Sequence, residues 1–252
     1  MKLPAMRFMC GLVLALASAS GPAIAQAIDA ACVKCHKELT TNKVVHEPMK
    51  DGCVKCHSTL DASVTPHKNT GAFAKGLAAE RSALCYSCHD KARAAHEKKV
   101  RHRTLRNCAK CHDAHSSKYA QLLTEDPSTL CFSCHERGDF DAKVKHEPAA
   151  DGSCTSCHEA HASDEPNLLS EPATKVCLDC HKKVLKRPHA ITGFASKGHP
   201  IGGEKPGLMD PARPDQPFYC GSCHDPHKSD NARLIRFDQR SPMGFCQKCH
   251  KI

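Results

Sequence analysis

The segment CAKCHDAH at residues 108–115 places two thiols and two imidazoles within eight positions. Two cysteines three residues apart can form a disulfide, supply half of a tetrahedral zinc site, or attach a group covalently. A histidine directly after the second cysteine adds a nitrogen ligand for a metal beside that pair. The first question is which chemistry needs this pattern, and the second is what the additional histidine does.

The pattern CxxCH occurs nine times and uses every cysteine of the chain except Cys10. The nine motifs, numbered I to IX in chain order, end at His36, His57, His89, His112, His135, His158, His181, His224 and His250. Their cysteine pairs are Cys32 and Cys35, Cys53 and Cys56, Cys85 and Cys88, Cys108 and Cys111, Cys131 and Cys134, Cys154 and Cys157, Cys177 and Cys180, Cys220 and Cys223, and Cys246 and Cys249.

One chemistry uses the whole pattern. Disulfides and zinc sites need cysteine pairs, but neither needs a histidine after the second cysteine in nine motifs out of nine. Attachment of c-type haem does, because two thiols add to the vinyl groups on one porphyrin edge while the adjacent imidazole binds the iron. We therefore predict nine covalent haem c groups.

The motifs are also periodic. The first cysteines of motifs III to VII follow one another at intervals of 23 residues, and the flanking residues show a repeat of two motifs, roughly 46 residues long. Units that begin at Cys108, Cys154 and Cys220 each contain CxxCHxxH, a Leu-Leu or Leu-Ile step, and a second CxxCH. A looser unit begins at Cys53, and the unpaired motif I precedes it.

This doubled pattern resembles the doubled-CXXCH multihaem c-type cytochromes, among them the periplasmic cytochromes of porin–cytochrome conduits in metal-reducing and iron-oxidising bacteria. The resemblance covers nearly all of the chain after residue 25. It implies an electron-transfer protein with other redox proteins as partners, and it suggests an outer-membrane porin and an outer-surface cytochrome as candidate partners.

Histidines outside the motifs number ten, against nine predicted irons: His46, His67, His96, His102, His115, His146, His161, His189, His199 and His227. We therefore predict bis-histidine coordination. Three of these follow an attachment histidine by three residues, namely His115, His161 and His227. Four precede a motif, namely His46, His102, His146 and His199, and His67 is a displaced member. The ninth ligand is His96 or His189, and the other is spare. Methionines at 49, 209 and 243 are less favoured because histidines suffice.

The spacing of His112 and His115 indicates what the second histidine does. Residues three apart in a helical turn project from roughly the same face. The two axial ligands of one iron lie on opposite faces of the porphyrin, and three residues cannot carry the chain around it. We therefore expect His115 to serve a different haem from the one attached at Cys108 and Cys111.

The elements that position these residues must do so with few large side chains. The chain has no Trp and 4 % aromatic residues, so porphyrins would provide much of the buried apolar surface. We expect a multihaem cytochrome c fold, with short α-helices and irregular loops around a chain of haems and little or no β-sheet. The connection 182–219, with six Pro and five Gly, is expected to be a loop.

Residues 1–25 have the features of a cleaved signal peptide. Lys2 and Arg7 precede an apolar stretch, and small residues at 23–25 suit a cleavage site before Gln26. An uncleaved anchor is the alternative. We expect an exported protein, periplasmic or associated with the outer membrane, alternatively extracellular. Residues 26–252 are then expected to form one elongated nonahaem domain.

The net charge and the number of histidines available to iron distinguish the possible functions. The formal charge of +9 falls to +7 without Lys2 and Arg7, and haem propionates would outweigh this excess, so nucleic-acid binding has no support. We expect an electron carrier or conduit and no enzyme. One alternative is a subunit of an extracellular cytochrome filament, a homopolymer. The other is a multihaem oxyanion reductase, which would need an iron with an open position.

Overall fold

A computed structural model describes residues 30–186, 189, 199–202, 207–238 and 240–251. The predicted signal peptide and the cleavage site before Gln26 lie outside the described residues, as does part of the connection 182–219. Within the described ranges, no helix is long and apolar enough to cross a membrane.

The helices are short, and most of them lead into a CxxCH motif. The α-helices are α2 (Arg81–Tyr86), α3 (Asp90–Ala94), α4 (Pro127–Leu130), α5 (Glu147–Ala150), α6 (Ala173–Cys180) and α7 (Pro242–Cys246), and a further helical turn spans 30–35. Side-chain caps begin several of them. The Glu80 carboxylate accepts from the backbone of Ser82 at the start of α2, and Asp126 accepts from Ser128 before α4.

Isolated 3-10 turns are the commonest element. They are η1 (Lys37–Thr40), η2 (Glu47–Lys50), η3 (Cys53–Lys55), η4 (Ala74–Gly76), η5 (Ala95–Glu97), η6 (Cys108–Lys110), η7 (Ala120–Leu122), η8 (Cys131–Ser133), η9 (Arg137–Phe140), η10 (Cys154–Ser156), η11 (Pro166–Leu168), η12 (Lys182–Lys186), η13 (Cys220–Ser222) and η14 (Ala232–Leu234). Even-numbered motifs begin in a lone 3-10 turn, whereas odd-numbered motifs lie in or directly after an α-helical segment. This alternation is the structural form of the two-motif repeat.

In the part of the chain that the structure describes, the strands form five two-stranded antiparallel sheets. They pair as β1 (Val44–Val45) with β5 (Ser116–Ser117), β2 (Leu60–Asp61) with β3 (Lys68–Asn69), β4 (Val100–Arg101) with β7 (Ala162–Ser163), β6 (Val144–Lys145) with β10 (Lys228–Ser229), and β8 (Met209–Asp210) with β9 (Arg213–Pro217). Three of these ladders join segments far apart in the sequence. In each of the three a Val faces a Ser: Val44 faces Ser117, Val100 faces Ser163, and Val144 faces Ser229.

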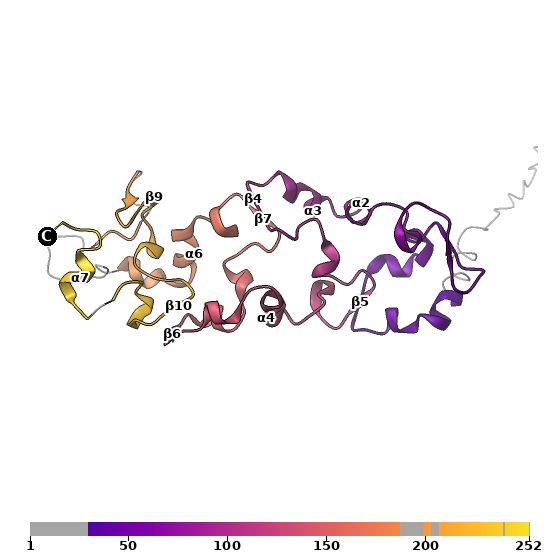
Figure 1. Ribbon diagram of the computed structural model, residues 1–252, viewed down its shortest axis with the longest axis horizontal. Helices are drawn as coiled ribbons and strands as arrows, with labels where there is room; N and C mark the ends of the chain where they lie inside the picture. The colour runs from indigo at the N-terminus through magenta and orange to yellow at the C-terminus, as the bar shows by residue number, and fades with distance from the viewer. Residues whose placement is uncertain (1–29, 187–188, 190–198, 203–206, 239, 252) are drawn as a thin grey trace, which may run out of the picture.

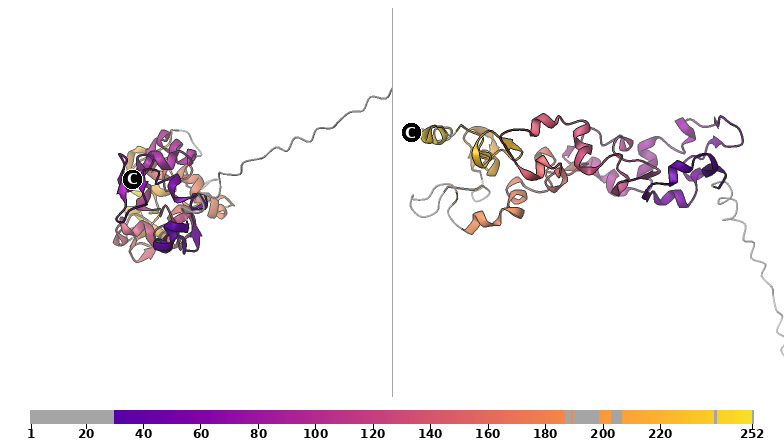
Figure 2. Two further views of the ribbon diagram at one scale, coloured as in Figure 1. Left: turned by 90° about the vertical axis from the view of Figure 1, so that its right-hand side faces the viewer. Right: turned by 90° about the horizontal axis from the view of Figure 1, so that it is seen from below.

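The molecule is long and narrow, and the chain advances along its length. In Figure 1 the colour runs from indigo at one end to yellow at the other, and Figure 2 shows a compact cross-section when the molecule is viewed end-on. Among the described residues, Phe218 and Ile235 are the apolar side chains that are buried. The predicted fold of short helices, loops and little sheet is confirmed, and side chains supply almost none of its interior.

The connection 182–219 departs in part from the predicted loop. Its last third contains the β8–β9 hairpin, which is held by a buried ion pair. The Asp210 side chain is fully buried and lies 2.8 Å from the Arg213 guanidinium, while its carboxylate also accepts from the Ala212 backbone. Residues 182–186 of this connection form η12, and residues 187–188, 190–198 and 203–206 lie outside the described residues. Pro and Gly content could not reveal a hairpin that is held by a pairing of two side chains.

Candidate haem-attachment sites

All nine CxxCH motifs fold into the same turn. The backbone N–H of each motif histidine donates to the carbonyl of the first cysteine of its motif, at 2.9–3.0 Å. Such a turn places the two cysteines, three residues apart, on one face of the chain. In seven of the nine pairs both cysteines are free thiols, and within the described ranges no three metal-binding side chains converge as a zinc site requires. This geometry suits attachment of one group to both thiols and the neighbouring imidazole.

Each attachment histidine faces one histidine from outside the motifs. The centroids of the two imidazoles lie 6.0–6.3 Å apart in every case. The pairs, with the attachment histidine first, are His36 with His67, His57 with His115, His89 with His46, His112 with His161, His135 with His102, His158 with His227, His181 with His146, His224 with His189, and His250 with His199.

This separation fits a metal held between two imidazoles. A metal–nitrogen bond of about 2 Å on each side, plus about 1.1 Å from each nitrogen to its ring centroid, gives a spacing of about 6 Å. Direct ring stacking would bring the centroids closer. The interplanar angle varies from 9° for His57 and His115 to 85° for His199 and His250, so the spacing is the shared feature.

Hydrogen bonds on the other ring nitrogen determine which nitrogen is available to a metal. In the four even-numbered motifs, Nδ1–H of the attachment histidine donates to a backbone carbonyl at 2.7–2.8 Å; the acceptors are Lys75, Gln121, Asn167 and Arg233. A proton on Nδ1 leaves the lone pair on Nε2. Ligating histidines in metalloproteins are oriented by this kind of bond.

The residues that accept these bonds have an unusual backbone. Lys75, Gln121, Asn167 and Arg233 have φ between 52° and 60°, and Leu122, Leu168 and Leu234 continue the left-handed turn. Left-handed φ in residues with a β-carbon costs roughly 1–2 kcal/mol each. The Leu-Leu step is visible in the sequence, but this role of the residues before it was not predicted from the sequence. The signal was present, because Gln121, Asn167 and Arg233 each follow their attachment histidine by nine residues.

The histidines outside the motifs are brought together in twos by the long-range ladders. His46 N–H donates to the His115 carbonyl beside β1–β5, at 2.8 Å. The same bond joins His102 to His161 beside β4–β7 and His146 to His227 beside β6–β10, both at 2.9 Å. The two histidines of a ladder face different motifs, and these are consecutive: II and III, IV and V, then VI and VII.

Further bonds orient these histidines. Nδ1–H of His46 donates to the Ala114 carbonyl, and that of His146 to the Pro226 carbonyl, both at 2.8 Å. The Asp113 carboxylate accepts from the backbone of His115. Burial lowers the pKa of His115, as it does for His161 and His227. A lowered pKa keeps the imidazole neutral, which is the form that binds a metal.

The structure separates His112 from His115 and distinguishes the two candidates for the spare histidine. His115 faces His57 of motif II, whereas His112 faces His161. His189 faces His224. His96 faces no attachment histidine; its Nε2 lies 2.5 Å from the Tyr86 hydroxyl oxygen. Met209 and Met243 are exposed.

Cysteines of successive motifs are neighbours in space. Burial, and after it the interaction with the hydrogen-bonded Cys108 thiol, together raise the pKa of Cys85 to about 11. Burial and the Cys154 thiol raise the pKa of Cys131 to about 11 in the same way. The Cys177 and Cys220 thiols are likewise hydrogen-bonded. Second cysteines influence one another electrostatically between the alternate motifs: the Cys134 thiol raises the pKa of Cys111, Cys180 that of Cys157, and Cys249 that of Cys223, in each case after burial as the larger cause. The attachment sites from III to IX therefore follow one another in chain order.

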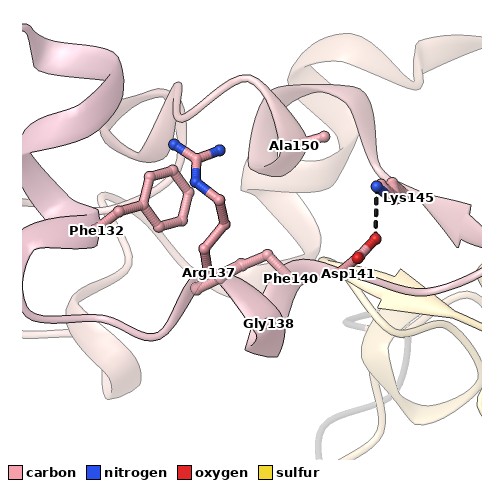
Figure 3. Close-up of a pocket in the computed structure, with 7 residues that line it drawn as sticks. All are labelled: Phe132, Arg137, Gly138, Phe140, Asp141, Lys145 and Ala150. Carbon is pink, nitrogen blue, oxygen red and sulfur yellow. Dashed lines mark ion pairs between the residues drawn. The ribbon is translucent and has the colours of Figure 1, made fainter.

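A hollow of about 360 Å³ lies beside motif V, between Phe132, Arg137, Phe140 and Lys145 (Figure 3). The Arg137 guanidinium covers the Phe132 ring at 4.0 Å, and Phe140 contacts the His227 ring, with centroids 5.2 Å apart. The Lys145 ammonium is paired with Asp141. Aromatic and cationic groups around one hollow suit a flat apolar group with carboxylates, which is the chemical character of haem.

Comparison with known proteins gives one family. The family model described as "Doubled CXXCH motif" matches residues 46–94, 102–140, 146–186 and 210–251, which is more than half of the chain. No curated protein matches significantly.

Proposed function

From the premise that the chain belongs to the doubled-CXXCH family and is a multihaem c-type cytochrome that transfers electrons, we propose that it carries nine bis-histidine haems in a row. The observation that carries this proposal is the set of nine histidine pairs spaced for one metal each. The family match alone supports several haems, and the histidine pairs support the number nine.

Each covalently bound haem supplies a one-electron ferric/ferrous couple, and two histidines keep its potential low relative to a His/Met site. Residues of the chain hold and orient this group. The thiols would hold the porphyrin edge, the two imidazoles of each pair would hold the iron, and the carbonyls that accept from Nδ1 would keep the imidazoles oriented. Iron held by two imidazoles would have no position open to a substrate, which supports a carrier over an oxyanion reductase.

Close spacing of consecutive sites supports a conduit. Cysteines of successive motifs interact with one another, so consecutive attachment edges are neighbours, and the chain advances along the long axis of the molecule (Figure 1). Fast tunnelling needs such an arrangement. We propose that electrons enter at one end and leave at the other. The partners would be redox proteins in the periplasm on one side and an outer-membrane porin or outer-surface cytochrome on the other, which requires export.

The test is native extraction followed by intact mass and spectroscopy. We expect nine covalent haems on the exported chain and an oxidised spectrum that is low-spin throughout. Six or fewer haems, or a high-spin site that turns over nitrite or sulfite, would contradict the proposal. Co-extraction of a porin would support the conduit, whereas long polymers would favour the filament.

A further inference from the structure

At the three long-range ladders, one rule relates each histidine outside the motifs to the motif that it faces. The histidine that precedes an even-numbered motif faces the next odd-numbered motif, as His46 faces His89 of motif III. Its ladder partner faces the even-numbered motif itself, as His115 faces His57 of motif II. That partner always comes from the following repeat. The members are 69, 59 and 81 residues apart in His46/His115, His102/His161 and His146/His227.

At motif VIII the source of the ligand changes. His199 precedes motif VIII and faces His250 of motif IX, as the rule requires. The histidine that faces His224 of motif VIII is His189, which lies ten residues before His199 and belongs to no following repeat.

The local geometry at His189 reproduces that of the ladders. The His199 N–H donates to the His189 carbonyl at 3.3 Å, the same backbone bond that joins His46 to His115. The centroid spacing of 6.1 Å to His224 equals that of His46 to His89. The His199 ring also packs on buried Phe218, with centroids 5.9 Å apart. A short-range pair therefore occupies the position that a long-range ladder occupies elsewhere.

Motif I also faces a histidine from a position that differs from the rule. Under the rule, His36 of motif I would face a histidine that precedes an earlier motif. It faces His67 instead, at 6.1 Å, from the turn between β2 and β3. The His67 Nδ1–H donates to the Val64 carbonyl at 2.8 Å, a bond made within the same turn. Motif I and the last even-numbered motif, VIII, therefore both face a histidine that no further repeat supplies.

Resting on the proposed function, we propose that His67 and His189 close the two ends of the haem array, so that motifs I to IX need no axial ligand from a further repeat or from a second copy of the chain. Solenoid proteins end in atypical repeats for a related reason, because a terminal repeat lacks one neighbour. Two copies can then exchange electrons across the outer edges of their terminal haems, but they share no histidine.

The test compares His189→Ala with His96→Ala in the full-length exported holoprotein. His189→Ala should keep nine covalent haems by intact mass, because attachment needs only the thiols and His224. One haem in nine should become high-spin, and added imidazole should return it to low-spin. His96→Ala should leave the spectrum unchanged, since His96 faces Tyr86.

Two further measurements keep the inference falsifiable if His189→Ala matures poorly. His189→Met should stay low-spin and raise the potential of one haem, because thioether ligation raises it. Dilution of the wild-type protein should not create a high-spin site. A low-spin His189→Ala variant, a spectrum changed by His96→Ala, a His189→Met variant with unshifted potentials, or a dilution-dependent high-spin site would overturn the closure.

These outcomes are distinguishable from a failure of the proposed function. That failure would appear in the wild-type protein itself, as fewer than nine haems or a persistent high-spin site at every concentration. The closure fails when the wild-type protein has nine low-spin haems and His189 is not one of their ligands.

Discussion

At the scale of single residues, backbone carbonyls accept hydrogen bonds from attachment imidazoles and so orient them. Gln121, Asn167 and Arg233 adopt left-handed φ, and each carbonyl accepts Nδ1–H of the attachment histidine nine residues earlier. The strain of those residues is compensated by two bonds, since the next leucine carbonyl also accepts a backbone N–H, as Leu122 does from Asp113. The turn thereby orients an imidazole before any group is attached.

His115 provides a direct test at this scale. His115→Ala should leave nine haems attached, because His57 and the thiols of motif II remain. It should leave one haem five-coordinate or water-bound and raise the potential of that haem. Optical and electron paramagnetic resonance spectra of the oxidised protein check this, with His96→Ala as the matched control. An unchanged spectrum would show that His115 is no ligand.

Motif residues could be predicted from sequence, but ligand partners could not. The CxxCH pattern names its own cysteines and proximal histidine. The partner of His115 is His57, 58 residues away, and that pairing depends on the β1–β5 ladder. Each strand of this ladder has two residues, too few for any alternating hydrophobic pattern to appear. The choice between His96 and His189 likewise depended on tertiary contacts.

At the scale of elements, two-residue ladders hold consecutive repeats together. Each long-range ladder contains a buried serine whose hydroxyl donates to a backbone carbonyl outside the ladder. The Ser163 hydroxyl donates to the Leu169 carbonyl and the Ser229 hydroxyl to the Ile235 carbonyl, both at 2.5 Å. The serine therefore ties the ladder to the leucine or isoleucine that directly follows the left-handed turn. Ladder, left-handed turn and attachment motif form one unit that recurs with the repeat.

Gly152 tests how closely adjacent motifs pack. It precedes motif VI with φ of +77°, and a β-carbon there would lie 2.0 Å from the carbonyl oxygen of Ser128, which is part of α4. Gly152→Ala should lower stability by about 2–4 kcal/mol, from left-handed strain and overpacking against backbone. Denaturation midpoints check it. Gly138→Ala, where nothing lies within 4 Å, should change them little, and equal effects would refute the packing argument.

The β8–β9 hairpin should be sensitive to pH. Burial alone would raise the pKa of Asp210, but hydrogen bonds from Arg213, Ala212 and Ser222 outweigh it and hold the pKa below its usual value. Because the folded-state pKa is lowered, the stabilisation is complete above pH of about 4 and is lost as the pH falls through the lowered value. Hydrogen exchange of residues 209–217 should therefore quicken in acid.

Asp210→Asn is the matching variant for that experiment. It should remove the pH dependence and loosen the hairpin at neutral pH by about 3 kcal/mol, because Arg213 would lose its buried partner. Arg240 and Asp238 form an exposed pair, so Asp238→Asn is a control with little expected effect. An acid response that persists in Asp210→Asn would assign it to another group.

At the scale of the whole molecule, the proposed haem array would take the place of a side-chain core. Phe218 and Ile235 are the buried apolar side chains of the described residues, so under this proposal cohesion depends on the haems that the nine sites hold. Low aromatic content predicted this from composition alone. The end-to-end order of the sites could not be predicted that way, because a sequence repeat is compatible with a row or with a cluster. The elongated body, along which the chain advances from one end to the other, indicates a row (Figure 1).

Solution scattering tests this arrangement. A compact domain of about 227 residues has a radius of gyration of about 17 Å. The narrow body in Figures 1 and 2 predicts a larger value and a distance distribution with a long tail. The sample should be the exported holoprotein, verified as a monomer by light scattering, because dimers would lengthen the particle for another reason. His189→Ala is a useful comparison, since loss of one axial bond at motif VIII should leave the other eight sites and the overall length nearly unchanged. A monomer that fits a compact sphere would contradict a row of sites from end to end, and with it the assignment of electron entry and exit to opposite ends of the molecule.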